Sequence, residues 1–150
     1  MSNVFAAERP LIEQIRTLVP GLADVGSVSK LAGYQPDQIP TPAVYVMPGE
    51  SQVPGGADDP EDGAVQIDRQ TWEVVVVVAH QQDVLTDDTD TTAKRAGEIL
   101  FQVMQALVGW RPAQGFLPFA YRGRPAPDYS PGYAEFPALF QTGLVITGNN

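Results

Sequence analysis

The stretch VQIDRQTWEVVVVVAHQQ, residues 65–82, is the strongest strand signal in this chain and decides its fold class. Its first half alternates apolar and polar residues, which is typical of a strand with one buried face. From Val74 to Val78 every residue is apolar, so both faces of the strand need cover. A central, fully buried strand satisfies this pattern. We expect helices to cover one face and a neighbouring subunit to cover the other, because such a strand aggregates when it is exposed.

Two helices are predicted outside this strand. Residues 8–19 carry an apolar stripe at helical spacing, with Pro10 in the first turn and Pro20-Gly21 after the last. Residues 90–108 carry a broader stripe that begins at Ala96 and ends at Val108. Asp87, Asp88 and Asp90 stand near the start of this second helix, where the helix dipole favours negative charge.

The remaining elements are shorter. Residues 43–48 (AVYVMP) are rich in strand-forming side chains, and residues 133–147 alternate around Phe140, Leu144 and Ile146, with Pro137 at an edge or a bulge. A short strand over Asp24–Val28 and a helical turn over Ser29–Gly33 are predicted before them. We read residues 115–123 as an aromatic, apolar segment and residues 124–132 as a loop. The predicted fold is therefore one α+β domain over residues 1–150, with a mainly antiparallel or mixed sheet and two main helices on one face.

Residues 49–64 are predicted to form a long mobile loop. The segment has almost no apolar side chains, and four acids lie between Asp58 and Asp62. Loops of this length without secondary structure are usually functional or disordered.

Composition excludes several classes of protein. The formal net charge is −9 and the nine Lys and Arg residues are spread along the chain, so we expect no nucleic-acid specificity. The absence of cysteine excludes disulfides and thiolate chemistry. No apolar run approaches the roughly 20 residues that a membrane helix needs, and the N-terminus lacks the order of a secretory signal.

The search for catalytic and metal sites predicts none. His80 is the only histidine and has no cysteine or second histidine with which to bind zinc, so we read it as a strand-end surface residue. The two acidic clusters, 58–62 and 83–90, lack the ligand spacing of a calcium loop. Phosphate-binding glycine loops and the G-x-S-x-G elbow do not occur. We therefore expect no enzymatic activity, no cofactor and no bound metal.

Contact residues are predicted from charge and from the valine run. Three arginines, Arg111, Arg122 and Arg124, lie close together in the sequence around the aromatic segment 115–123, against the acidic balance of the chain. They are either ordinary surface residues or a positive patch that meets an acidic loop of a neighbour. The predicted subunit or partner interface comprises Asp58, Asp59, Glu61, Asp62, Val75, Val77, Arg111, Arg122 and Arg124.

The joint ALVGWRP, residues 106–112, is predicted to be a structural clasp. Gly109 allows the left-handed conformation that ends a helix, and Pro112 prevents the helix from resuming. Trp110 is expected to fold over the helix end and pack against the aromatic segment that follows.

Taken in order, four segments resemble one protein family. They are LVPGL at the end of the first helix, PTPAVYVMPGES before the polar loop, QTWEVVVVVAHQ, and the helix-terminal ALVGWRP. Together with the closing strand they resemble the tail terminator proteins of tailed bacteriophages and prophages over nearly the whole chain.

The resemblance implies a ring of six subunits on the last ring of the tail tube. Such a ring stops tube polymerisation and offers its other face to head–neck (connector) proteins, with no enzymatic activity and no cofactor. It also implies a place in the virion at the tail–neck junction, after assembly in the bacterial host cytoplasm. Two alternatives remain: another head–tail connector or neck protein, and a small-molecule-binding or enzymatic α+β domain with a pocket between helix 90–108 and the sheet.

Overall fold

The computed structural model describes residues 3–54, 65–80 and 90–149. The elements follow in the order α1 (Glu8–Leu18), β1 (Asp24–Ser27), α2 (Val28–Ala32), a 3₁₀ turn (Pro36–Gln38), β2 (Ala43–Gln52), β3 (Val65–His80), α3 (Thr91–Leu107), β4 (Ala120–Tyr121), β5 (Asp128–Ser130) and β6 (Gly132–Thr147). Asp90 caps α3, because its carboxylate accepts a hydrogen bond from the N–H of Ala93.

The strands form one mixed six-stranded sheet in the order β1-β2-β3-β6-β4, with β5 also paired to β6. β1 and β2 run parallel, and the other pairs are antiparallel. β3 and β6 pair along their whole length, from Val65 opposite Thr147 to His80 opposite Gly132. The predicted α+β class with a mixed sheet is therefore confirmed.

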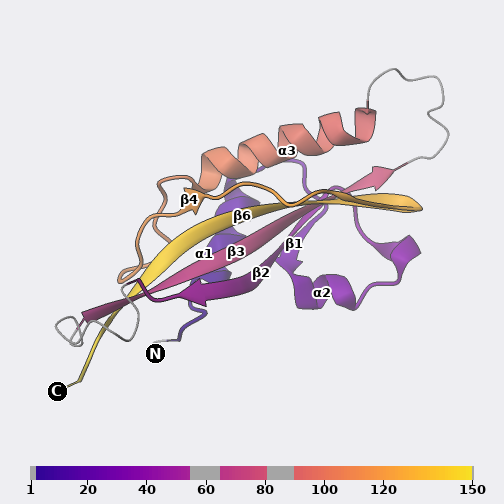
Figure 1. The fold of residues 1–150 in the computed structure, drawn as a ribbon. Helices are drawn as coiled ribbons and strands as arrows, with labels where there is room; N and C mark the ends of the chain where they lie inside the picture. Colours follow the sequence, from indigo (N-terminus) through magenta and orange to yellow (C-terminus); the bar gives the residue numbers. More distant parts are fainter. Residues whose placement is uncertain (1–2, 55–64, 81–89, 150) are drawn as a thin grey trace.

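One face of the sheet packs against α1 and α3 (Figure 1). Trp72, Val74 and Val76 point from β3 into this core, where Leu11 of α1 and Val103 of α3 meet them. All five side chains are fully buried. The expectation of two main helices on one face of the sheet is confirmed.

The opposite face is covered by the chain itself over the valine run. Val75 is 7% exposed and Val77 is 0% exposed. They pack with Tyr45 beneath side chains from residues 28–39, among them Leu31 and Tyr34. The expectation that a neighbouring subunit covers this part of the face is wrong for Val75 and Val77, because α2 and the turn after it fold back over them.

Hydrogen bonds to Asp24 hold this covering segment in place. The carboxylate accepts from Lys30 Nζ at 2.6 Å, from Tyr34 OH at 3.0 Å and from Tyr45 OH at 2.9 Å. Burial alone raises the pKa of Asp24, but hydrogen bonds from Lys30, Tyr45 and Tyr34 outweigh it and hold the pKa below its ordinary value. One carboxylate thus ties β1, α2 and β2 together.

β2 is longer than the sequence predicted. A loop was expected from residue 49, but the ladder with β3 continues past an irregularity to Ser51 opposite Gln70 and Gln52 opposite Arg69. A side chain at Gly49 would lie 3.0 Å from the backbone oxygen of Thr71, so glycine allows this close approach. The rest of the expected loop, residues 55–64, lies outside the described residues, as do Asp87 and Asp88.

The chain after α3 also departs from the prediction. In the aromatic segment 115–123 only β4 is a strand, and Phe116 forms a single bridge to Leu144. The predicted loop 124–132 contains β5, which pairs with β6 through a turn at Gly132 with φ +90°. The sequence did not indicate this short strand, because the segment is rich in polar and proline residues. The strand forms because β6 lies beside it, and its own residues show no strand-like alternation.

Candidate assembly surfaces

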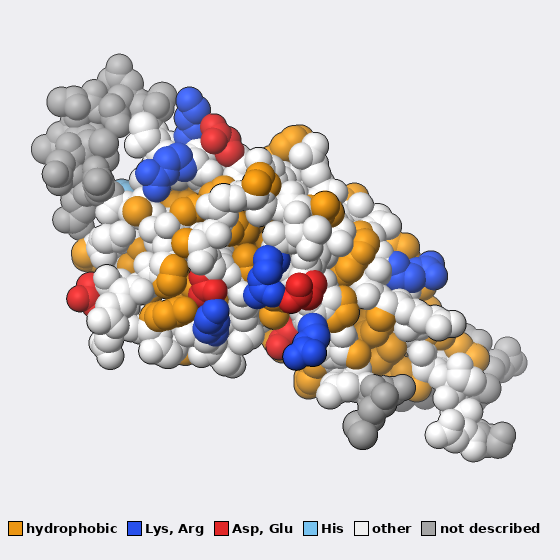
Figure 2. All heavy atoms as spheres, turned by 180° about the vertical axis from the view of Figure 1, so that it is seen from behind, with side chains coloured by type: hydrophobic (Ala, Val, Ile, Leu, Met, Phe, Trp, Pro, Cys, Tyr) orange, Lys and Arg blue, Asp and Glu red, His pale blue; other side chains and the backbone are white. Residues whose placement is uncertain are grey.

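The sheet projects beyond the helices at one end, and this projecting end carries exposed apolar side chains. In Figure 1 the ends of β2, β3 and β6 extend to the lower left, away from α3. Val53, Val65, Val145 and Ile146 are 44%, 49%, 37% and 46% exposed. Seen from behind, hydrophobic side chains gather toward the tapering lower-right end of the molecule (Figure 2). Val145 and Ile146 point to opposite faces of the strand, so both faces offer apolar surface here.

Between this end and α2, the second face of the sheet is left half-exposed and is partly acidic. Glu73 and Leu139 lie opposite each other on β3 and β6, and both are half-buried. Burial raises the pKa of Glu135 on the same face, and the negative charges of Asp128 and Glu73 raise it further. This face therefore combines the apolar side chain of Leu139 with the carboxyl groups of Glu73 and Glu135.

The predicted arginines do not share one hollow. Arg122 donates from Nε and Nη2 to Oε1 of Gln141, at 3.1 and 2.9 Å, and lines a small depression with Arg69. Arg124 lines a different cleft, described below. Arg111 is exposed beside the end of α3. The acids predicted to meet these arginines, Asp58, Asp59, Glu61 and Asp62, lie outside the described residues.

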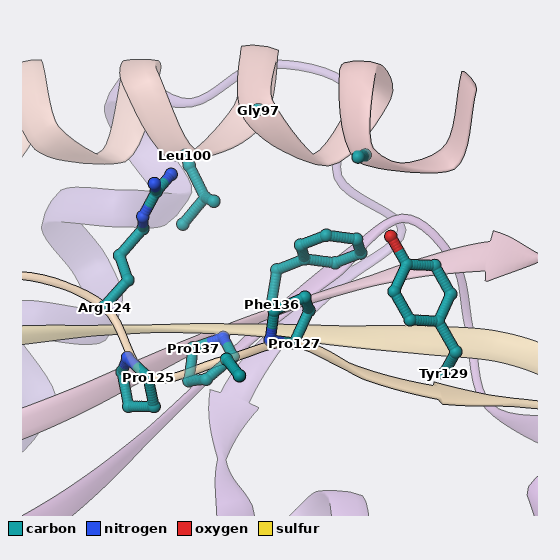
Figure 3. A pocket seen from close by; sticks show the side chains of 10 residues that line it. Gly97, Leu100, Arg124, Pro125, Pro127, Tyr129, Phe136 and Pro137 are labelled. Carbon is teal, nitrogen blue, oxygen red and sulfur yellow. The ribbon is translucent and has the colours of Figure 1, made fainter. Parts of the chain in front are cut away.

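A cleft of ≈380 Å³ opens between α3 and the chain that leads into β5 (Figure 3). We call it the β6-side cleft. Leu100 from α3 and Phe136 from β6 form its apolar walls, and the Arg124 side chain extends from the chain before β5 toward α3 (Figure 3). The residues that line it are Ala93, Gly97, Leu100, Arg124, Pro125, Ala126, Pro127, Tyr129, Phe136 and Pro137.

A polar contact at one end of the cleft joins β5 to the start of α3. Tyr129 OH donates to Oδ2 of Asp90, which raises the pKa of Tyr129 to about 12. The hydrogen bond from Tyr129 also lowers the pKa of Asp90. His80 packs edge-on against Tyr129, with ring centroids 5.1 Å apart, and its Nδ1 lies 3.0 Å from Oγ1 of Thr92. His80 thus has a packing role, and it lies in no metal-binding group that the described residues form.

The clasp at the end of α3 has a defined geometry. Gly109 has φ +78°, and its N–H donates to the carbonyl of Phe119 at 2.9 Å. Trp110 stacks on Phe119 with centroids 5.9 Å apart and planes 7° apart. Pro112 is buried, whereas Trp110 is only half-buried. The turn joins α3 to the aromatic segment by both backbone and side-chain contacts.

Sequence reasoning missed an exposed apolar pair before α1. Val4 and Phe5 are 48% and 54% exposed and line a hollow on the β2 side of the sheet with Asp68 and Trp72. We call Val4 and Phe5 the β2-side pair. Apolar residues just before a helix usually pack back onto it, so the sequence pattern does not distinguish this pair from a buried one.

These features define a small α+β protein whose mixed sheet leaves one end and one half-face uncovered. A family model described as phage tail terminator protein matches residues 1–150. The chain therefore belongs to the phage tail terminator family, and it is a structural protein of a phage-type tail.

Comparisons with individual proteins add the fold alone. A solved chain in the structure "Virion of native gene transfer agent (GTA) particle" is similar over 97% of this chain and 100% of its own length, with a TM-score of 0.56 and 16% identity. No curated protein sequence matches. In the described part of the chain, no helix has the length and apolar character needed to cross a membrane.

Proposed function

We propose that this protein forms a six-membered ring on the end of the tail tube, stops tube polymerisation and provides the surface for head–neck joining. The observation that supports this most directly is the projecting end of the sheet, where Val65, Val145 and Ile146 remain exposed beyond both helices. A strand ladder with apolar side chains on both faces needs a partner to shield it from water. The tail-tube protein is the partner that family membership suggests.

Ring closure requires two different surfaces on each subunit, because a cyclic contact joins one patch to another patch on the next copy. The described residues offer more than one such surface: the projecting end, the half-exposed sheet face and the β6-side cleft. A surface used within the ring and a surface used on the tube are therefore separable by mutation.

The partners we propose are further copies of the chain, the tail-tube protein and a head–neck (connector) protein, with no nucleic-acid or membrane partner. The place of action is the tail–neck junction of the virion, and assembly occurs in the bacterial host cytoplasm. We propose no enzymatic activity. In support, the one histidine of the chain, His80, is engaged by Thr92 and Tyr129.

The contact between an acidic segment and an arginine of the next subunit stays part of the proposal. Asp58, Asp59, Glu61 and Asp62 would meet Arg111, Arg122 or Arg124, setting register and encounter rate. Deletion of residues 53–62 should impair tail capping, whereas unimpaired capping would contradict a role for this segment.

The proposed function is tested by native mass spectrometry and electron microscopy of the purified protein, alone and with tail-tube subunits. We expect a hexamer, or rings seated on tube ends. A stable monomer that ignores tubes would contradict the proposal. A ring that joins neck proteins but leaves tube growth unchanged would identify a neighbouring connector component.

A further inference from the structure

The β6-side cleft has the chemistry of a site for an apolar group that carries a negative charge beside it. Its volume of ≈380 Å³ lies within the range of about 300–1,000 Å³ typical of binding pockets. Leu100 and Phe136 supply apolar walls, and Arg124 supplies a positive charge at the rim (Figure 3). One turn along α3 from Gly97, Phe101 is 61% exposed and extends the apolar surface of the helix.

Toward the β2 edge of the same helix-covered face, the β2-side pair has the complementary chemistry. Val4 and Phe5 are exposed, yet their backbone is fixed. Gln70, 6% exposed, donates from Nε2 to the carbonyl of Val4 at 2.7 Å. Trp72 Nε1 in turn donates to Oε1 of Gln70 at 3.2 Å. A buried polar chain thus holds two exposed apolar residues in one position, which lowers the entropy cost of inserting them into a partner.

Charge distinguishes the two surfaces further. Asp68 lines the same hollow as the β2-side pair, and its Oδ2 accepts from Gln70 at 2.9 Å. The ion pairs formed within the described residues are Glu13–Arg16 and Asp24–Lys30, so Asp68 and Arg124 belong to neither. The β2-side pair is therefore apolar with a carboxylate beside it, and the β6-side cleft is apolar with a guanidinium group at its rim.

The positions of the two surfaces suit a head-to-tail contact. β2 and β6 flank β3 on opposite sides in the sheet order. The β2-side pair and the β6-side cleft therefore lie toward opposite edges of one subunit, as a cyclic interface requires.

We propose that the β6-side cleft receives Val4 and Phe5 of a second copy of this chain, with Asp68 of one copy facing Arg124 of the next. This inference rests on the proposed ring and names the surfaces that would close it.

Gly97 provides a test that spares the fold. It lines the cleft from within α3, and a Cβ added there meets nothing within 4 Å. Gly97→Leu should fill the cleft and favour the helix, since glycine is a poor residue in a helix interior. We expect an unchanged or raised melting temperature and at least a tenfold weaker ring by native mass spectrometry. Gln102→Leu is the matched control, because Gln102 is exposed on the same helix, about 140° around from Gly97.

Cross-linking tests the partner directly, since the chain has no cysteine of its own. Under mild oxidation, a Phe5→Cys and Gly97→Cys double variant should give a ladder of linked subunits up to the size of the ring. Each single variant can link only like to like and should give nothing larger than a dimer.

The wild-type protein shows whether a negative result contradicts this contact or the proposed ring function. If wild-type protein forms rings, and Gly97→Leu forms the same rings with no ladder from the double cysteine variant, this contact is wrong while the ring function stands. If Gly97→Leu forms normal rings that no longer seat on tubes, the cleft takes the tube protein, and the second-copy assignment is overturned. If wild-type protein forms no ring with or without tube subunits, the proposed function fails.

Discussion

The Asp24 hydrogen bonds should make the cover over the valine run sensitive to acid. Asp24→Asn keeps an acceptor but removes the charge that three donors share, one of them the fully buried Tyr45. Hydrogen bonds to charged groups contribute about 1.5–3 kcal/mol each when buried, whereas a half-exposed lysine contributes little. We therefore expect Asp24→Asn to lower the free energy of unfolding by about 2 kcal/mol at pH 7, a melting temperature lower by roughly 4–8 °C.

The pH dependence gives the sharper test. The folded-state pKa of Asp24 lies below its ordinary value of 3.8, so its contribution is fully present above pH 3.8 and is lost as the pH falls through the folded-state pKa. The difference between wild type and Asp24→Asn should stay constant from pH 7 to 5 and shrink below pH 3.8.

Urea unfolding followed by tryptophan fluorescence measures this difference at each pH. Asp37→Asn is the control, because it removes the same charge from an exposed position in the 3₁₀ turn of the covering segment. A difference that persists unchanged to pH 2.5, or an Asp37→Asn variant as unstable as Asp24→Asn, would refute the reasoning.

Three further predictions concern the clasp, the core and the contact between β5 and α3. Trp110→Ala should cost about 2 kcal/mol, less than the 3–5 of a fully buried aromatic, because Trp110 is half-buried; an unchanged melting temperature with failed assembly would make it an interface residue. Val77→Asp should unfold the monomer by circular dichroism, whereas a stable monomer that only fails to assemble would restore the subunit-covered interpretation. Tyr129→Phe should have a lower melting temperature than wild type at pH 8. The difference in melting temperature should disappear as the pH rises through about 12, because wild-type Tyr129 then loses its proton and its hydrogen bond to Asp90. A difference that does not depend on pH would contradict this.

Most of the fold could be predicted from periodicity. The alternation of residues 65–73 and the apolar run after it located β3, and the stripes from Leu11 and Ala96 located α1 and α3. Each of these elements buries at least one face of its own side chains, so the spacing of its apolar residues indicates its secondary structure. Gly109 is similar, since a helix end with φ +78° favours glycine on local grounds.

What periodicity missed depends on contacts between distant residues. The cover over Val75 and Val77 comes from a segment whose helix is only five residues long. This segment is held by Asp24, which lies 21 positions before its hydrogen-bond partner Tyr45 on β2. The extension of β2 to Gln52 has polar, exposed side chains and exists because β3 continues beside it. The cleft lies between α3 and residues 124–129, which no local pattern joins.

The most direct test of the proposed function is the length distribution of tail tubes assembled in the presence of increasing amounts of this protein, measured by electron microscopy. If the protein terminates tubes, mean length should fall as its concentration rises, with a six-fold ring on one end of each shortened tube. Tubes of unchanged length with bare ends at every concentration would contradict the proposal.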